Sequence, residues 1–228
     1  MKTPLKYCKY IVNTFKCRLS KFFDIRESTI KYILYKINGI NNIIKVYDSK
    51  VTKSSFSFNG NNNSILFDDN ANMYYTNINI AGNNNKVSLN GCSGILNLTL
   101  RGNNCDVTIE KDSTMEGCYM VCMGQGNSIT IGNDCMFSGK VEIWNSDTHL
   151  ITDMEGNGIN PSKPISIGNH VWLGKEVKIL KGVTIGNNSV IGMGSIVTRD
   201  VADNSIAAGN PARTIKNNII WKKGFTNI

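Results

Sequence analysis

One polar segment of the chain holds the side chains best suited to proton transfer. Residues 144–149 read Trp-Asn-Ser-Asp-Thr-His, and the stretch that follows is rich in Gly, Asn and Pro. The imidazole of His149 is a side chain that can act as a general base near pH 7. Asp147 or a backbone carbonyl could hold its second ring nitrogen, and Asp147 could equally be a turn residue. On these residues alone, a catalytic role and a plain surface role for His149 both stay open.

The remaining histidine and the cysteines indicate no metal chemistry. His170 stands three places after the leading residue of a six-residue repeat, a place that faces outward, so we expect a plain surface role for it. There are seven cysteines, an odd number, with no CxxC pair. Cys118 and Cys122 could bind a metal only with histidines nearby, and the chain has just two. We predict reduced, partly buried cysteines and no metal site.

A six-residue repeat must position this polar segment. Inward-facing aliphatic residues recur every six positions, and a small or β-branched residue follows four places after each. The leading positions are Ile167, Leu173, Ile179, Ile185, Ile191 and Val197. Six residues suit one face of a triangular prism and three faces close a coil of 18, so this run predicts a solenoid. Residues 144–164 interrupt the hexads and must project as a loop, where function concentrates.

A longer and looser repeat precedes the hexads. Glycines 60, 82, 102 and 124 each begin a Gly/Asn-rich turn, and a β-like apolar segment follows each turn. The period of 20–22 residues predicts further solenoid coils. Gly and Asn suit a corner with positive φ, because Gly adopts that geometry freely and Asn at modest cost.

The first 50 residues predict helices instead. Leu5, Cys8, Val12, Phe15, Leu19 and Phe22 fall at three- and four-residue steps. A second stripe is formed by Ile30, Ile33, Leu34 and Ile37, with Ser28 as a cap and Gly39 as a stop. The two stripes predict a mainly helical N-terminal segment that packs on the body or on a neighbouring subunit.

This N-terminal segment also carries the excess positive charge of the protein. It holds 11 Lys and Arg against three acidic residues, whereas the remaining residues are balanced, and the net charge is +8. A basic segment suits either an ordinary solvated face or an anionic partner such as a membrane surface, polysaccharide or nucleic acid. We expect no signal peptide, and no apolar run reaches the roughly 18 residues that a membrane span needs.

From Asn145 onward the chain resembles the bacterial hexapeptide-repeat O-acetyltransferases that use acetyl-CoA. The motifs that carry the resemblance are Ser-Asp-Thr-His (146–149), Ile-Asn-Pro-Ser-Lys-Pro-Ile (159–165), Ile-Gly-Asn-His-Val-Trp-Leu-Gly (167–174), Gly-Val-Thr-Ile-Gly (182–186), Ile-Gly-Met-Gly-Ser-Ile-Val-Thr (191–198) and Ala-Gly-Asn-Pro-Ala-Arg (208–213). Within that family it most resembles enzymes that acetylate capsular or O-antigen polysaccharides, including sialic-acid capsules. The resemblance covers about residues 129–216.

The resemblance implies an all-β, left-handed parallel β-helix. Parallel crossovers are right-handed in about 98% of cases, so the left hand comes from the resemblance alone. We expect a basic, helical segment at 1–50, irregular coils at 51–128, a regular β-helix at 129–213 with its catalytic loop at 144–164, and a tail at 214–228. That tail is expected to form a short helix containing Trp221.

The resemblance also assigns site residues. It makes His149 the general base and places Trp172 at the thioester end of acetyl-CoA, with the backbone N–H of Lys175 as oxyanion donor; Asp147 is the candidate orienting residue. The remaining expected donor contacts are Gly174, Gly192, Met193 and Gly194 for the pantetheine arm, Thr198, Arg199, Arg213 and Lys216 for the phosphates, and Pro211 beside the adenine. The family often has a small residue where Lys175 stands.

The implied partners are a second and third copy of the chain and a polysaccharide acceptor. We expect a homotrimer with sites at subunit interfaces, no nucleic acid, and a cytoplasmic location with at most peripheral association with the inner face of the membrane. Two other functions stay open. One is acetylation of a small acceptor, such as a free sugar, a nucleotide-linked amino sugar or serine, and the other is a non-enzymatic β-solenoid.

Overall fold

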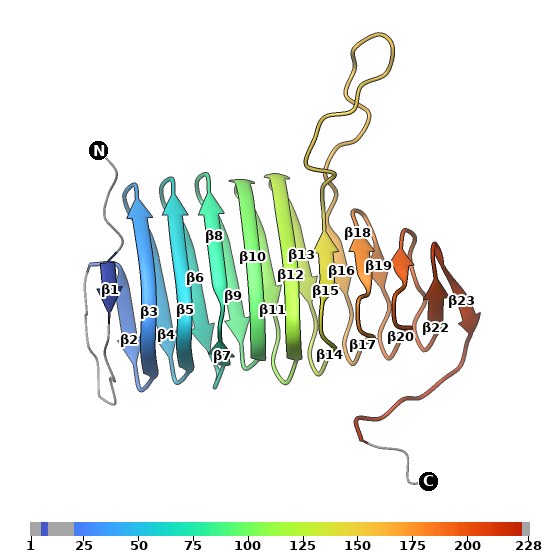
Figure 1. Ribbon diagram of the computed structural model, residues 1–228, viewed down its shortest axis with the longest axis horizontal. Coiled ribbons are helices and arrows are strands. Elements are labelled where there is room, and N and C mark those ends of the chain that lie inside the picture. Colours follow the sequence, from blue (N-terminus) through green and yellow to red (C-terminus); the bar gives the residue numbers. More distant parts are fainter. Residues whose placement is uncertain (1–5, 9–20, 225–228) are drawn as a thin grey trace.

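The computed structural model describes residues 6–8 and 21–224, and in them the chain forms a prism of stacked coils. Its parallel strands lie side by side along the long axis, and one loop projects from the body (Figure 1). No helix occurs in the described residues, and therefore none there could span a membrane. Apolar side chains fill the prism as one continuous core from Phe23 to Ala212.

Two sheets make up the prism. The larger has 15 strands: β1 (Lys6–Cys8), β3 (Thr29–Asn38), β5 (Lys50–Asn59), β7 (Asn72–Tyr74), β8 (Asn77–Ala81), β10 (Ser93–Asn103), β12 (Thr114–Gln125), β14 (Met136–Phe137), β15 (Val141–Trp144), β17 (Trp172–Leu173), β18 (Lys178–Leu180), β20 (Val190–Ile191), β21 (Ile196–Val197), β22 (Ile206–Gly209) and β23 (Ala212–Lys216). The smaller has eight: β2 (Phe23–Arg26), β4 (Ile43–Tyr47), β6 (Ser64–Asp68), β9 (Lys86–Asn90), β11 (Asp106–Ile109), β13 (Ser128–Ile131), β16 (Ile165–Ile167) and β19 (Thr184–Ile185).

The prism has three faces and three corners. The first face contains β7, β14, β17, β20 and β22, and the second contains β8, β15, β18 and β21. Strands β3, β5, β10 and β12 bend through both of these faces, and the eight-stranded sheet is the third face. We call the bend between the first and second faces the first corner. The second corner joins the second and third faces, and the third corner joins the third and first faces.

The hexads behave as predicted. The six leading positions are at most 2% exposed, and the residues four places later are at most 5% exposed. Paired residues in this part are 18 apart, as in Ile167 with Ile185 and Leu173 with Ile191. Three hexads therefore close one coil. Across the projecting loop the offset becomes 36, as in Met136 with Trp172, so the loop adds 18 residues without disturbing the stacking.

The second corner of the earlier coils is built from the predicted Gly/Asn repeat. Gly60, Gly82, Gly102 and Gly124 all have φ between 115° and 157°. A Cβ on Gly82 would lie 1.8 Å from the carbonyl oxygen of Gly102, so coil stacking also requires glycine here. The prediction that this corner needs positive φ is confirmed.

Buried asparagines stack beside these glycines. Asn63 Nδ2 donates to Asn42 Oδ1 at 3.0 Å, and Asn85 Nδ2 donates in turn to Asn63 Oδ1 at 3.0 Å. Each amide also donates to a glycine carbonyl, and Asn63 and Asn85 are fully buried. Because each of these amides both donates and accepts along the prism axis, the buried asparagines link the coils with their own polar atoms satisfied.

The predicted N-terminal helix is wrong for the described residues. Its second stripe lies in strand β3, and the first coil already begins at β2, well before residue 51. The cause is the first corner at Tyr32, whose φ is 57°. The corner adds one residue between Ile30 and Ile33, which mimics helical spacing, whereas alternate residues Ile33, Tyr35 and Ile37 then pack on the core. Most of the first stripe lies outside the described residues.

The predicted C-terminal helix is also wrong. Ala212–Lys216 forms strand β23, antiparallel to β22, and residues 217–224 follow without regular structure. Trp221 is 9% exposed and packs with Ile219 against Val190 on the first face. A segment held by contacts with the prism needs no helical hydrogen bonds of its own.

Candidate active site

The loop after β15 leaves the prism at the second corner, and three side chains hold its base. Asn160 Nδ2 donates to Asp147 Oδ2 at 2.9 Å and to the carbonyl oxygen of His149 at 2.8 Å. Asn160 Oδ1 accepts from the backbone N–H of Ile151 at 2.7 Å. Lys181, from the same corner one coil later, forms an ion pair with Asp147. Asn160 and Lys181 therefore fix the backbone on both sides of His149.

One oxygen of the Asp147 carboxylate, Oδ2, accepts from both of these partners. The Lys181 ammonium and, less strongly, the Asn160 amide lower the pKa of Asp147. Among the described residues no hydrogen bond joins Asp147, or any other group, to the imidazole of His149. The contacts of Asp147 thus order the loop backbone, and the ring of His149 stays available to a ligand.

His149 is exposed and borders a cleft of about 270 Å³ on the second face. Its lining residues come from three successive strands and the loop base: Thr99, Arg101, Tyr119, Val121, Met123, Trp144, Thr148 and His149. The rings of Tyr119 and Trp144 meet edge to face, with centroids 5.5 Å apart. Trp144 Nε1 donates to Glu142 at 3.0 Å, and Glu142 pairs with Lys178. The floor of the cleft is therefore a fixed aromatic surface with one arginine beside it.

The residues expected to grip the pantetheine arm gather at the first corner. Gly174 and Lys175 lie in one coil, and Gly192, Met193 and Gly194 lie in the next. The Gly194 N–H donates to the Lys175 carbonyl at 2.8 Å. A Cβ on Gly174 would lie 2.7 Å from the Met193 nitrogen, so coil stacking itself requires this glycine. Lys175 and Met193 are exposed, the latter at 73%.

The other expected donor contacts lie elsewhere. Thr198 and Arg199 follow β21 at the second corner, where Arg199 stands one coil beyond Lys181. Pro211, Arg213 and Lys216 lie in the β22–β23 turn and β23, and all three are exposed. Within one chain the second face separates the first corner from the second corner with His149. The predicted site residues thus form separate groups and make no single pocket in one chain.

Trp172 lies on the first face and is 37% exposed. Residues 217–224, which we call the C-terminal strap, run back across this face toward β14. The Trp221 ring lies 6.0 Å from that of Trp172 and stacks on His170 with centroids 4.0 Å apart. The strap therefore covers one side of Trp172 and leaves the other side open.

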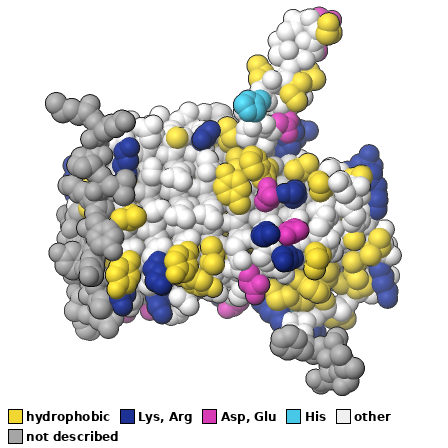
Figure 2. All heavy atoms as spheres, in the orientation of Figure 1, with side chains coloured by type: hydrophobic (Ala, Val, Ile, Leu, Met, Phe, Trp, Pro, Cys, Tyr) yellow, Lys and Arg dark blue, Asp and Glu magenta, His cyan; other side chains and the backbone are white. Residues whose placement is uncertain are grey.

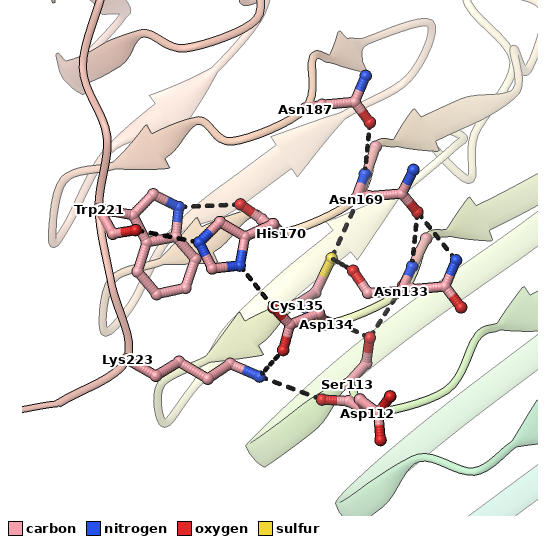
Figure 3. Close-up of polar contacts among 12 residues, drawn as sticks. Asp112, Ser113, Asn133, Asp134, Cys135, Asn169, His170, Asn187, Trp221 and Lys223 are labelled. Atoms are coloured by element: carbon pink, nitrogen blue, oxygen red, sulfur yellow. Dashed lines mark hydrogen bonds and ion pairs between the residues drawn. The ribbon is translucent and has the colours of Figure 1, made fainter.

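The expectation of a plain surface role for His170 is wrong. Its Nδ1 lies 2.6 Å from Asp134 Oδ2 and its Nε2 lies 3.1 Å from the Trp221 carbonyl oxygen, while Trp221 Nε1 donates to the His170 carbonyl (Figure 3). Lys223 also contacts Asp134, and it donates to the Asp112 carbonyl at 3.2 Å. Lys223 first, and His170 after it, lower the pKa of Asp134. His170 anchors the strap and does not face the cleft.

Several residues of the site carry no signal in the sequence taken alone. Asn160 lies inside a quoted motif, but its bonds to both sides of His149 depend on how the loop folds back. Lys181, Arg101 and Tyr119 reach the site from other coils. Only the 18- to 22-residue register, applied coil by coil, would have placed them beside the loop. No group of His, Cys, Asp and Glu suited to a metal ion occurs in the described residues.

Comparisons with known proteins extend over almost the whole prism. Residues 164–199 match the family described as bacterial transferase hexapeptide (six repeats). The polysialic acid O-acetyltransferase of Neisseria meningitidis is 37% identical over 154 residues, which are 65% of this chain and 70% of that protein. The galactoside O-acetyltransferase of Escherichia coli K12 is 45% identical over 89 residues, 39% of this chain and 44% of that protein.

Two solved structures match both the regular and the irregular coils. The polysialic acid O-acetyltransferase OatWY has a TM-score of 0.78 at 35% identity, over 84% of this chain and 92% of that one. The polysialic-acid-specific acetyltransferase NeuO has a TM-score of 0.77 at 34% identity, over 86% and 91%. The hexapeptide repeat and these matches make the prism a left-handed parallel β-helix, as predicted.

Proposed function

Because this chain belongs to the hexapeptide-repeat O-acetyltransferases, we propose that it moves an acetyl group from acetyl-CoA to a hydroxyl of a cell-surface polysaccharide. The observation that carries the proposal is the exposed imidazole of His149 at the rim of an aromatic cleft. Relatives that match most of the chain are named for acetylation of polysialic acid, an anionic polymer. An open cleft on a long flat face suits a polymer that enters and leaves at both sides.

His149 is the proposed general base. A hydroxyl of the acceptor donates its proton to the imidazole while its oxygen attacks the thioester carbonyl carbon. The new carbon–oxygen bond forms, the carbon–sulfur bond breaks, and the imidazolium returns the proton to the departing thiolate. The loop base supports this role because Asn160 and Lys181 hold the backbone on both sides of His149. The described residues offer the ring no hydrogen-bond partner of their own, so the acceptor hydroxyl meets no competitor.

Arg101 and the Tyr119–Trp144 pair are the proposed acceptor contacts. The two aromatic rings give a rigid apolar surface for the C–H face of a sugar, and Trp144 is held by its bond to Glu142. The guanidinium of Arg101 suits the carboxylate of an acidic sugar, because its planar donors match a carboxylate. This combination favours an acidic sugar over a neutral one.

We further propose that the donor binds between two chains of a homotrimer. The residues expected to grip the pantetheine arm lie at the first corner and the base lies at the second, with the whole second face between them. A neighbouring prism that brings its first corner to the His149 loop would complete the site. Cyclic assembly around one axis would then give three equivalent sites. Light scattering of the purified protein tests this arrangement, and a monomeric mass would contradict it.

The galactoside relatives favour a second candidate, acetylation of a small neutral sugar. The two candidates separate in one assay: transfer from labelled acetyl-CoA to polysialic acid, to other capsular polymers and to simple galactosides. We expect transfer to the anionic polymer to be the fastest. Faster transfer to galactosides would replace the polymer proposal.

The base is tested by His149→Ala. We expect kcat to fall by about 10²–10⁴-fold, the usual contribution of a general base, with little change in the melting temperature because the loop lies outside the core. Thr148→Ser is a suitable control, since it changes the neighbouring residue of the loop but keeps its hydroxyl and the imidazole of His149. Full activity in the histidine variant would remove His149 from the mechanism.

A further inference from the structure

A row of aromatic and basic side chains occupies the first corner of the early coils, away from His149. We call it the Tyr–Lys ridge, and its members are Lys31, Tyr32, Lys53, Tyr74 and Tyr75. The register stacks them along the axis, because Lys31 pairs with Thr52 and Thr52 pairs with Tyr74. Figure 2 shows hydrophobic and basic side chains together on this side of the early coils.

The members of the ridge contact each other while staying accessible. Lys53 Nζ donates to the Tyr75 hydroxyl at 3.0 Å and lies 5.0 Å from the centre of that ring. The rings of Tyr74 and Tyr75 meet edge to face at 6.2 Å, and the two residues are 40% and 51% exposed. Lys31 lies 5.4 Å from the ring centre of Tyr32. Among the described residues neither ammonium has a carboxylate partner.

The backbone of the ridge is unfavourable for its residue types. Tyr32, Lys53 and Tyr75 have φ values of 57°, 50° and 50°. Later coils place Gly117, Lys140, Glu176 and Gly194 at the same corner with positive φ, so this conformation belongs to the corner itself, and glycine adopts it freely. For the bulky residues Tyr32 and Tyr75 this conformation is uncommon, and Gly or Asn would turn the corner at lower cost. The turn alone therefore does not account for the two tyrosines.

We propose that the Tyr–Lys ridge is a second binding site for an anionic polysaccharide, and this rests on the proposed function. The tyrosine rings offer flat apolar faces and hydroxyls to sugar rings. The two ammoniums supply the charge that carboxylated sugars need, and they are free of internal carboxylates that would compete. The ridge therefore holds a distant part of the same polymer whose hydroxyl meets His149.

The ridge and the cleft are joined by the second face of one chain. Strands β8, β10, β12 and β15 follow one another there, so Tyr75 lies roughly 15 Å along the axis from the strand of Trp144, at about 4.8 Å per strand. A shallow polar depression lies between them, lined by Ser57, Asn59, Asn79, Ile80, Ala81, Thr99, Leu100 and Arg101. A polymer of several sugars can reach both sites, whereas a short oligosaccharide reaches only one.

The test compares acceptor lengths in a variant that removes the ridge, Lys53→Asn with Tyr75→Asn. Asparagine tolerates the positive φ of both positions, so we expect the melting temperature to stay the same or rise. With long polysialic acid chains as acceptor we expect KM to rise by at least about tenfold, within the gain that a linked second contact gives. With a short sialic-acid oligomer we expect unchanged kcat and KM. Lys140→Asn, at the same corner in a later coil with φ of 61°, is the matched control and should behave as the parent protein.

Four outcomes would contradict the proposal that the Tyr–Lys ridge binds the polymer. They are an unchanged KM for the long polymer, an equal loss with both acceptor lengths, the same loss in the Lys140 control, and a changed molecular mass, which would make the ridge a subunit contact. Direct binding of long polysialic acid, measured by calorimetry without any acetyl donor, separates the ridge from the proposed reaction. If the parent protein binds the polymer through the ridge but acetylates no polymer, only the proposed function fails.

Discussion

The base of the catalytic loop gives the sharpest prediction, and the change that tests it is Asn160→Ala. The side chain of Asn160 makes three hydrogen bonds, to Asp147 Oδ2, to the His149 carbonyl and from the Ile151 N–H, at 2.7–2.9 Å. A hydrogen bond contributes about 0.5–1.5 kcal/mol net, and these partners are exposed to solvent. Losing all three therefore costs the ordered loop base about 2 kcal/mol.

The free-energy cost of losing these hydrogen bonds predicts how far kcat should fall. Each 1.4 kcal/mol is a factor of ten, so the ratio of ordered to open loop bases falls by roughly 30-fold. Catalysis needs the base within hydrogen-bond reach of the acceptor hydroxyl, and a displacement of about 1 Å can cost 10²-fold. We expect kcat to fall, by up to about 30-fold, in steady-state acetyl transfer. The melting temperature should not change, because the core register continues across the loop.

The matched control lies on the same loop. Asn157→Ala removes a bond to Asp153 Oδ2 at 3.0 Å, near the tip and away from His149. It should leave kcat at the parent value. Parent activity in Asn160→Ala, or an equal loss in both variants, would refute the idea that Asn160 positions the base.

Two further predictions concern the corners and the strap. Gly82→Ala should lower the free energy of unfolding by about 3–5 kcal/mol in urea titrations, because its Cβ would lie 1.8 Å from a neighbouring carbonyl oxygen. Gly126→Ala has open space around its Cβ and a φ of 61°, so it should lower the free energy of unfolding by only about 1–2 kcal/mol. Similar losses in the two variants would contradict the conclusion that coil stacking requires glycine at position 82. The lowered pKa of Asp134 means that its pairing with Lys223 stabilises the strap fully above the unfolded value of about 4 and is lost as pH falls through the folded value. Fluorescence of Trp221, taken as the difference from Trp221→Phe, should therefore stay constant from pH 8 to pH 5 and change only in stronger acid; a transition near pH 6 would show that Asp134 is not the group that holds it.

The repeats made most of the fold predictable, because each coil buries the same positions. Ile167, Leu173 and Ile179 face the core for the same reason, so their spacing alone gives the coil length. The same logic failed in β3, where the corner at Tyr32 shifted the alternation by one residue and produced a helical spacing. The spacing of apolar residues shows which residues face the core. Within a single coil, this spacing does not distinguish a turn of helix from a tight corner between two strands.

The candidate site was less predictable because its parts come from different coils. The motif indicates His149, but the residues that hold the loop, Asn160 and Lys181, are fixed by three-dimensional folding. The strap illustrates the same limit. The sequence led us to expect a short C-terminal helix containing Trp221. In the structure Trp221 stacks on His170, a contact that depends on both residues lying on the same side of the prism.

The two ends of the larger sheet have a consequence for association between molecules. A stack of parallel coils offers the same unpaired strand edge at each end, and another copy of the chain could add to that edge and grow a filament. In this sheet every strand pairing is parallel except the first and the last, where β1 lies antiparallel to β3 and β23 lies antiparallel to β22. A reversed strand does not offer the parallel pattern of backbone hydrogen-bonding groups that a further coil would need. The larger sheet therefore ends in a reversed strand at each end, which disfavours growth of a filament through these two edges.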